Sequence, residues 1–195
     1  MSGVTGIVLA AGASERMGES KLLLPYRGAT VLDATIAAVT ASAVDRVIVV
    51  TGARADEVEA AVKSRQVAIV RNPDYRRGNM SSLLTGTAGD AGAEAFIVVP
   101  GDMPTVRTAA LDSMIELWFE TGPWAAVAEY DDRIAHPFLL SRRAVDAMDQ
   151  MTGEKVLGRL LVDSDDDRVI RLSVHHKAPR DVNTPEDYAK LLEES

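Results

Sequence analysis

Cysteine is absent from this chain of 195 residues, so disulfide bonds and thiolate chemistry are excluded, and a zinc site would need histidine and carboxylate ligands alone. The histidines, His136, His175 and His176, lack the H-E-x-x-H spacing of metalloproteases. No apolar run reaches the roughly 18 residues of a membrane span, and the first residues lack the basic and apolar segments of a secretory signal. We therefore expect a cytoplasmic protein that does not enter the membrane.

Positive charge is scarce as well. The chain has 21 lysines and arginines against 29 aspartates and glutamates, which gives a formal net charge of -8 at pH 7. Because nucleic-acid binding normally requires a basic face, this balance argues against a nucleic-acid partner. Positive charge at a binding site must therefore be local. The apolar fraction of 47% is sufficient for one substantial core, and we expect a single domain over residues 1–195.

Short apolar, β-branched runs alternate with helical patterns along the first half of the chain. The runs predict buried strands, and the stretches between them predict amphipathic helices. Such alternation predicts a three-layer α/β fold with a mostly parallel, Rossmann-like sheet and helices on both faces. We expect strands at Gly6 to Leu9, Arg46 to Thr51, Val67 to Val70 and Ala95 to Val99, and helices at Thr30 to Ser42 and Ala55 to Ser64.

The second half of the chain is less regular. The acidic run from Asp163 to Asp167 predicts a solvated turn, because it lacks the glycine and terminal glutamate of a calcium loop. Thr184 and Asp187 have the spacing of an N-cap and its partner, which predicts a helix start. We expect helices at Arg107 to Thr121 and Arg142 to Met151, strands at Trp124 to Tyr130 and Val169 to Val174, and an extension of the sheet at Pro137 to Leu140.

The segment from Ile7 to Pro25, IVLAAGASERMGESKLLLP, leads from an apolar strand through a loop of small residues to a lysine. Small side chains from Ala10 to Ala13 let backbone N–H groups converge on an anion, and Arg16 and Lys21 add positive charge. Neither the G-x-x-x-x-G-K-[ST] phosphate loop nor the G-x-G-x-x-G dinucleotide turn is present. We therefore predict a different phosphate-binding loop; the alternative is an ordinary β-to-α connection with surface charges.

Asp102 follows directly after the strand pattern Phe-Ile-Val-Val-Pro. Open α/β sheets bind ligands beyond the carboxyl ends of their strands, which brings together the loops at residues 10–21, 72–82 and 101–104. Mg²⁺ prefers a few carboxylate or amide oxygens completed by water and substrate phosphates, so Asp102 is a candidate ligand for this ion. The alternative is a turn in which its side chain bonds local N–H groups.

The pattern L-A-A-G-x-S-x-R-M-G-x-x-K-L-L-L-P, from Leu9 to Pro25, resembles the signature of the MobA-like nucleotidyltransferases. Four later segments follow in the family's order, at residues 72–86, Pro100 to Pro104, Ala135 to Pro137 and Asp181 to Asp187. Within the family, the chain is most similar to the molybdenum cofactor cytidylyltransferases. The resemblance implies the nucleotide-diphospho-sugar transferase fold, with a nucleotide-binding half at about residues 1–105 and an acceptor-binding half at about 106–195.

The resemblance also implies an activity. Such enzymes transfer a nucleoside monophosphate from an NTP to a phosphorylated acceptor and release pyrophosphate. We expect CTP as the donor, because guanylyl enzymes tend to have glycine at the position of Ala11, and a molybdopterin-type cofactor as the small-molecule acceptor. Mg²⁺ is the expected metal, with Mn²⁺ as a substitute, and a molybdoenzyme or its maturation chaperone is an expected partner.

The same resemblance assigns roles to single residues. Arg16, Lys21 and Asp102 form the catalytic group. The second metal ligand is expected from Asp181 or Asn183, and the family more often has aspartate at the latter position. Nucleotide contacts are expected at Leu9, Ala10, Ala11, Gly12, Ser14, Gly78, Ser81 and Ser82, and His136 is expected to help hold the acceptor.

Some of these assignments have structural alternatives or depart from the family's pattern. Ser81 or Ser82 would instead cap a helix, and a lone histidine such as His136 is more often structural. Ala135 replaces a glycine of the family. Residues 153–159 replace a Gly-Asp-x-Gly-Ala-Arg stretch that is expected to face the acceptor.

A phosphate monoester has a second pKa of about 6, so at neutral pH it can attack the α-phosphorus in line without a general base. Repulsion between anions is then the main barrier, which magnesium on Asp102, together with Arg16 and Lys21, would reduce. The alternatives are a sugar-1-phosphate or phospho-lactate nucleotidyltransferase, and a nucleotide-binding regulator without catalysis. A Rossmann oxidoreductase is disfavoured, because the G-x-G-x-x-G turn is missing.

Overall fold

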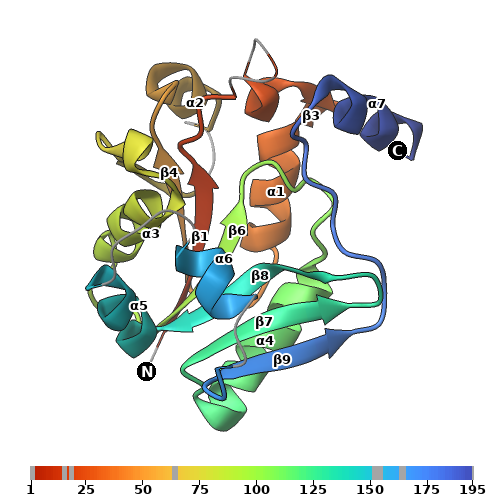
Figure 1. Ribbon diagram of the computed structural model, residues 1–195. Helices are drawn as coiled ribbons and strands as arrows, with labels where there is room; N and C mark the ends of the chain where they lie inside the picture. Colours follow the sequence, from red (N-terminus) through yellow and green to blue (C-terminus); the bar gives the residue numbers. More distant parts are fainter. Residues whose placement is uncertain are drawn as a thin grey trace.

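The computed structural model describes residues 3–14, 17, 20–62, 66–150, 156–162 and 166–194. Within these residues, seven strands form the main sheet in the order β5-β4-β1-β6-β8-β7-β9, and helices cover both of its faces (Figure 1). The predicted three-layer α/β architecture is therefore confirmed. The strands are β1 (Val4–Ala10), β4 (Arg46–Thr51), β5 (Ala68–Arg71), β6 (Ala95–Pro100), β7 (Ala125–Tyr130), β8 (Ile134–Ser141) and β9 (Val169–Val174).

Parallel strands form the first half of the sheet. β1 pairs with β4 on one side and β6 on the other, so that Leu9 lies opposite both Val50 and Pro100. β5 continues the parallel arrangement beyond β4. Ile48 and Ile97 have no exposed surface, because helices pack on both sides of these strands and make continuous apolar runs favourable. The carboxyl ends of β1, β4 and β6 consequently lie at one edge of the sheet.

The second half of the sheet is mixed. β8 runs antiparallel between β6 and β7, and β9 pairs in parallel with β7. The predicted sheet extension at Pro137 to Leu140 is present, but the strand already begins at Ile134. This longer strand includes His136, which is joined to Pro137 by a cis peptide bond. The sequence did not predict the first residues of β8, from Ile134 to His136, because they do not form an apolar run.

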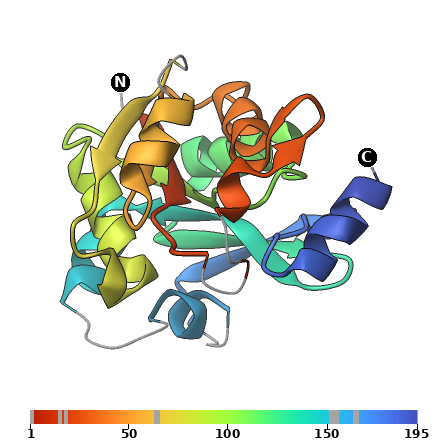
Figure 2. The ribbon, with the colours of Figure 1, turned by 90° about the horizontal axis from the view of Figure 1, so that it is seen from above.

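Each face of the sheet packs against its own set of helices and forms its own core cluster. Alternate residues of each central strand point to opposite faces; Val49 and Ile97 join one core cluster, whereas Ile48 and Val98 join the other. The first cluster includes α1 (Val31–Thr40), α2 (Ala55–Val62) and α4 (Thr108–Thr121), and the second includes α3 (Asn79–Ala88), α5 (Arg142–Asp149) and α6 (Val156–Leu161) (Figure 2).

Among the described residues, none of the helices has the length and apolarity that a membrane crossing needs.

The C-terminal segment returns to the carboxyl edge of the parallel strands. After β9, the chain runs back along the molecule to α7 (Pro185–Glu193), drawn in dark blue in Figure 1. α7 packs on a small hairpin formed by β2 (Pro25–Tyr26) and β3 (Ala29–Thr30). The hydroxyl of Tyr188 donates a hydrogen bond to the carbonyl of Pro25 at 2.6 Å. The last helix is thus attached to the chain that directly follows the first loop.

The turn before α7 is fixed by both side-chain and backbone contacts. Thr184 caps the helix, and Asp187 makes the reciprocal contact of a capping box, as predicted. The N–H of Val182 donates to the carbonyl of Asp102 at 3.0 Å. These contacts bring Asn183 next to the loop that follows β6.

Candidate active site

The small residues after β1 lead the backbone away from the sheet. Ala11 is buried, whereas Gly12 is exposed. Ser14 has a positive φ of 54°, and its Oγ accepts a hydrogen bond from the N–H of Lys21 at 3.3 Å. Ser14 therefore joins the two ends of the loop, in addition to its predicted role in nucleotide binding. Arg16, the other predicted cation of this loop, lies outside the described residues.

The loop is packed against the end of β4. The carbonyl of Ala11 accepts a hydrogen bond from the N–H of Ala53 at 3.1 Å. A Cβ atom on Gly52 would lie 2.7 Å from the Cβ of Ala11 and 2.8 Å from the Cβ of Tyr75, so only glycine leaves room for this contact. Gly52 was not predicted as a site residue; the available signal was its position directly after a buried strand.

A Gly12→Ala substitution should separate phosphate binding from folding. No described atom lies within 4 Å of the position that a Cβ atom would take, so we expect little change in the unfolding temperature. The added methyl group would crowd an anion bound by the loop N–H groups, and we expect weaker CTP binding. Thermal unfolding and calorimetric titration with CTP and Mg²⁺ measure the two effects. Equal CTP affinities in the variant and the wild type would contradict the phosphate-loop assignment.

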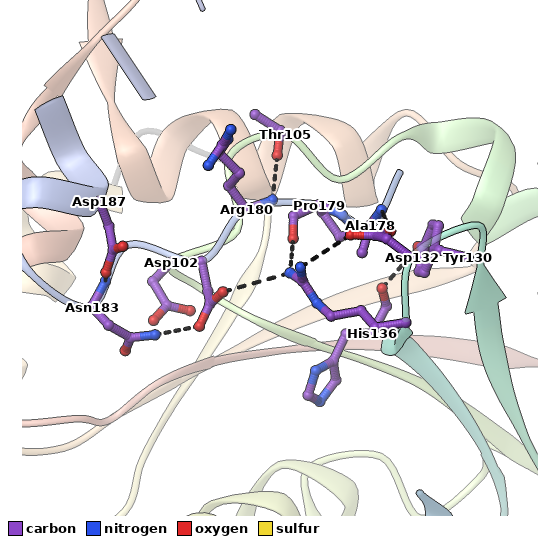
Figure 3. Close-up of polar contacts among 12 residues, drawn as sticks. Asp102, Thr105, Tyr130, Asp132, His136, Ala178, Pro179, Arg180, Asn183 and Asp187 are labelled. Carbon is purple, nitrogen blue, oxygen red and sulfur yellow. Dashed lines mark hydrogen bonds and ion pairs between the residues drawn. The ribbon is translucent and has the colours of Figure 1, made fainter. Parts of the chain in front are cut away.

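A lysine, an aspartate and an asparagine from three separate parts of the chain meet beyond β1 and β6. Lys21 begins a short 3-10 helix, Asp102 lies in the turn after β6, and Asn183 precedes α7. Lys21 Nζ forms an ion pair with Asp102 Oδ2 and donates to Asn183 Oδ1 at 3.0 Å. The side chains of Lys21 and Asp102 are only 16% and 12% exposed, so solvent screens their attraction weakly. Figure 3 shows Asp102 and Asn183 close together.

The backbone around Asp102 is fixed by three elements. The N–H of Gly101 donates to the carbonyl of Leu9 at 2.8 Å, and the hydroxyl of Thr35 on α1 donates to the carbonyl of Gly101 at 3.0 Å. The C-terminal segment adds the hydrogen bond from Val182 to the Asp102 carbonyl. The Asp102 carboxylate thus projects from a turn that is fixed by backbone contacts. Its partner, Lys21, comes from a distant, earlier part of the sequence.

The oxygens of this cluster fit a divalent cation. Asp102 Oδ2 and Asn183 Oδ1 both contact one cationic atom, Lys21 Nζ, which shows that they converge on a point. Mg²⁺ accepts one or two protein oxygens when waters and substrate phosphates complete its shell. In the described part of the chain, no group of three or more histidine, cysteine, aspartate or glutamate side chains is arranged to hold a metal ion. A cation here would therefore rely on the substrate for part of its coordination.

Asp181 is linked to this cluster through Asn183. Its Oδ2 accepts a hydrogen bond from Asn183 Nδ2, and its Oδ1 lies 3.9 Å from Nη2 of Arg133. The sequence left Asp181 and Asn183 as alternatives for the second metal ligand. Because the oxygen of Asn183 faces Lys21 and Asp102, the geometry favours Asn183 for this role.

A buried asparagine organises the loop before α3. Asn72 follows β5, and its Nδ2 donates to the Oγ atoms of Ser81 and Ser82, both at 3.0 Å. The helix begins at Asn79 with Gly78 as its N-cap, so the alternative that either serine caps this helix is wrong. The contacts of Gly78, Ser81 and Ser82 with base and ribose stay a prediction. Asn72 belongs to a motif seen in the sequence, but its function as a buried link was not predicted.

His136 is half-buried on β8. Its ring stacks on Phe138 with centroids 3.9 Å apart, and its carbonyl accepts a hydrogen bond from the hydroxyl of Tyr130 at 2.9 Å (Figure 3). Burial lowers the pKa of His136 to about 3 and raises the pKa of Tyr130. A neutral imidazole can offer a hydrogen bond to an acceptor, but not a positive charge.

The lowered pKa of His136 predicts a pH effect on stability. Its folded pKa of about 3 lies below the ordinary value, so protons bind the unfolded chain more tightly. The stabilising contribution is complete above about pH 6.5 and declines as the pH falls toward the folded pKa. We expect the wild type to lose stability on acidification more steeply than a His136→Gln variant. Thermal unfolding from neutral to acidic pH and NMR titration of the imidazole check this; a ring that titrates at its ordinary pKa would contradict it.

Two predicted segments lie partly outside the described residues. In the altered stretch, residues 153–155 are not described, and α6 begins at Val156. In the acidic run, residues 163–165 are not described. Asp166 pairs with Arg168 at 2.6 Å, and this hydrogen-bonded contact lowers the pKa of Asp166 to about 2. The described part of the run agrees with a solvated turn before β9.

Comparison with known families decides the class of protein. The model of the MobA-like NTP transferase domain matches residues 6–169. The chain belongs to the MobA-like NTP transferase family. The chain is 32% identical over 143 residues to molybdenum cofactor cytidylyltransferase of Escherichia coli. The aligned region covers 73% of this chain and 72% of that protein. It is also 34% identical over 113 residues to nicotine blue oxidoreductase of Paenarthrobacter nicotinovorans, covering 57% and 55% of the two chains.

Solved structures support the fold of this MobA-like transferase. Rv0371c from Mycobacterium tuberculosis is 35% identical, with a TM-score of 0.89 over 98% of both chains. The structure of its complex with manganese gives 32% identity and a TM-score of 0.86 over 100% of both chains. CMP:2-keto-3-deoxy-manno-octonic acid synthetase complexed with CTP is 14% identical, with a TM-score of 0.81 over 99% of this chain and 98% of that one, which shows a shared fold alone. The expected nucleotide-diphospho-sugar transferase fold is thus confirmed.

Proposed function

We propose that this MobA-like transferase moves CMP from CTP to the terminal phosphate of a molybdopterin-type cofactor and releases pyrophosphate. The identity with the Escherichia coli cytidylyltransferase over 73% of the chain supports this substrate pair. Ala11 supports the choice of CTP, since guanylyl enzymes tend to have glycine there. The observation that carries the proposal is the contact of Lys21 Nζ with both Asp102 and Asn183, which gathers one cation and two oxygen ligands beside the phosphate loop.

The proposed work is divided among the residues of this cluster and the first loop. The backbone N–H groups of residues 10–14 would orient the triphosphate, and Lys21 and Arg16 would offset its charge. Asp102 and Asn183 would hold Mg²⁺ or Mn²⁺, which supplies positive charge against the repulsion between the reacting phosphates. Manganese in the Rv0371c complex is consistent with this choice of metal.

The reaction needs no protein base. A phosphate oxygen of the acceptor forms a bond to the α-phosphorus, while the bond from that phosphorus to the oxygen of the β-phosphate breaks and its electron pair leaves with pyrophosphate. At neutral pH the attacking monoester is mainly dianionic, because its second pKa is about 6. The neutral ring of His136 would then contact the acceptor through a hydrogen bond.

We assign the nucleotide to the half up to about residue 105 and the acceptor to the later half. The phosphate loop and Asp102 lie in the first half, and β7 and β8, with His136, lie in the second. The product would pass to a molybdoenzyme or its maturation chaperone.

Pyrophosphate release tests the proposed reaction. The protein is incubated with CTP, GTP, ATP, UTP or dTTP, with Mg²⁺ or with EDTA, and with molybdopterin-type cofactor, a sugar 1-phosphate or phospho-lactate as the acceptor. Release that requires CTP, Mg²⁺ and the pterin supports the proposal. Preference for another base or acceptor moves the chain to a sister transferase.

Two other outcomes point to different classes of function. Tight nucleotide binding without pyrophosphate release from any acceptor would indicate a nucleotide-binding regulator. Because nicotine blue oxidoreductase is among the relatives, oxidation of NADH and NADPH is followed in parallel. Cofactor oxidation without nucleotidyl transfer would overturn the proposal.

A further inference from the structure

The tip of the β7–β8 hairpin reaches the segment that leads to Asn183. Asp132 Oδ1 accepts a hydrogen bond from the N–H of Ala178 at 2.7 Å (Figure 3). Arg133 Nη2 donates to the carbonyl of Pro179 at 2.9 Å. The hydrogen bond from Ala178 lowers the pKa of Asp132, so this carboxylate stays charged at neutral pH. The hairpin tip therefore holds the C-terminal segment from the side of the second half of the sheet.

The segment is held on its other side by the loop after β6. The N–H of Arg180 donates to Oγ1 of Thr105 at 2.9 Å, and the N–H of Val182 donates to the carbonyl of Asp102 at 3.0 Å. These two N–H groups flank Asp181 directly. The backbone that carries the Asp181 side chain is consequently fixed before and after it.

The two ends of the Asn183 amide have different partners, Asp181 on one side and Lys21 on the other. A carboxamide has an oxygen at one end and an NH₂ group at the other, with nearly the same shape. Asn183 Nδ2 donates to Asp181 Oδ2, which leaves Oδ1 turned toward Lys21. An ionised carboxylate only accepts hydrogen bonds, so it would not bind the reversed amide. The reversed amide would also point N–H donors at Lys21 and at a metal ion, and neither can accept them.

We propose that Asp181, oriented by Arg133, is a positioning residue that keeps the oxygen of Asn183 turned toward the metal ion. The inference rests on the proposed function, because it assumes a metal on Asp102 and Asn183. Asp181 acts through the Asn183 amide and does not itself bind the metal. Arg133 offsets its negative charge across 3.9 Å and is tied to the same segment through Pro179.

A double-mutant cycle tests this function. An Asn183→Asp side chain has oxygen at both ends, so its orientation no longer matters. Alone, Asp181→Ala should weaken Mn²⁺ binding by about 10- to 100-fold, the usual cost of losing a residue that orients a metal ligand. In the Asn183→Asp background, the same substitution should cost nothing. Water-proton relaxation enhancement with Mn²⁺ and CTP, without acceptor, reports immobilised metal independently of turnover.

The outcomes separate this inference from the proposed function. Wild-type protein that immobilises no Mn²⁺ overturns the metal assignment of the proposed function, and with it the inference. Wild-type binding with equal loss in both backgrounds overturns the inference alone, because Asp181 would then be a direct ligand. Wild-type binding without loss in either background overturns it too.

Conservative and matched variants complete the test. Asp181→Asn keeps an oxygen that can accept from the Asn183 amide, so it should retain more Mn²⁺ affinity than Asp181→Ala. Arg133→Met should cost only a few-fold, because its ion pair is partly exposed. Arg168→Met removes a similar pair just before β9, beside the end of β7 that is far from the hairpin tip, and should change nothing. Thermal unfolding confirms that each variant folds.

Discussion

An Asp102→Asn protein is expected to fold like the wild type and to transfer nucleotide about 100- to 1,000-fold more slowly, a loss of about 3 to 4 kcal/mol of barrier stabilisation. Asparagine keeps the size of the side chain but removes the negative charge that a divalent cation requires. The hydrogen bonds from Gly101 to Leu9 and from Val182 to Asp102 use the backbone and remain in the variant. Pyrophosphate release at saturating CTP and Mg²⁺ measures the loss.

The matched control is Asp146→Asn, which makes the same chemical change at an exposed carboxylate on α5. It should leave both turnover and unfolding temperature at the wild-type level. An Asp102→Asn protein with wild-type turnover and unchanged Mg²⁺ dependence would contradict the metal assignment of Asp102.

Lys21→Met should slow nucleotidyl transfer strongly while making metal binding easier. Methionine has a similar length but no charge, so a group that offsets phosphate charge is lost and turnover falls by about 100- to 1,000-fold. In the wild type, the Lys21 ammonium contacts the oxygens of Asp102 and Asn183 that a metal would use. Removing the ammonium should therefore tighten Mn²⁺ binding in the absence of nucleotide.

The rise in unfolding temperature on adding Mn²⁺ without nucleotide measures this second effect. It should be small in the wild type, where ammonium and metal compete, and larger in Lys21→Met. Lys190→Met, at an exposed position on α7, is the control and should change neither turnover nor the response to Mn²⁺. A Lys21→Met protein with the wild-type response to Mn²⁺ would contradict the competition. If the competition holds, metal and nucleotide bind together, because phosphates draw the ammonium away from the two oxygens.

The central strands could be predicted because their burial is written in consecutive residues. The run at Arg46 to Thr51 predicted β4 to the residue, since a strand covered on both faces is apolar along its whole length. The β2–β3 hairpin was not predicted, because two-residue strands have no periodicity to detect. The start of β8 was missed for a different reason. Its first residues become a strand by pairing with β7, a contact that adjacent sequence does not encode.

The candidate site was predicted where topology alone decides position. Lys21 and Asp102 follow β1 and β6, and neighbouring parallel strands end at the same edge, with Leu9 opposite Pro100. Their meeting could therefore be expected before any coordinates were known. Asn183 is different, because it reaches the cluster only through the return of the chain after β9 and the packing of α7.

The sequence by itself determined the three-layer fold, the phosphate-loop candidate and the acidic residue after β6, because burial patterns and strand ends are local properties of the chain. Only the tertiary structure placed the side-chain oxygen of Asn183 against Lys21, with Asp181 behind it. It alone also showed Gly52 behind the loop and Arg133 beside Asp181. These relations depend on which atoms of distant segments come within hydrogen-bond or van der Waals distance. Such distances are set by the packing of the whole molecule, and no spacing within a single segment contains them.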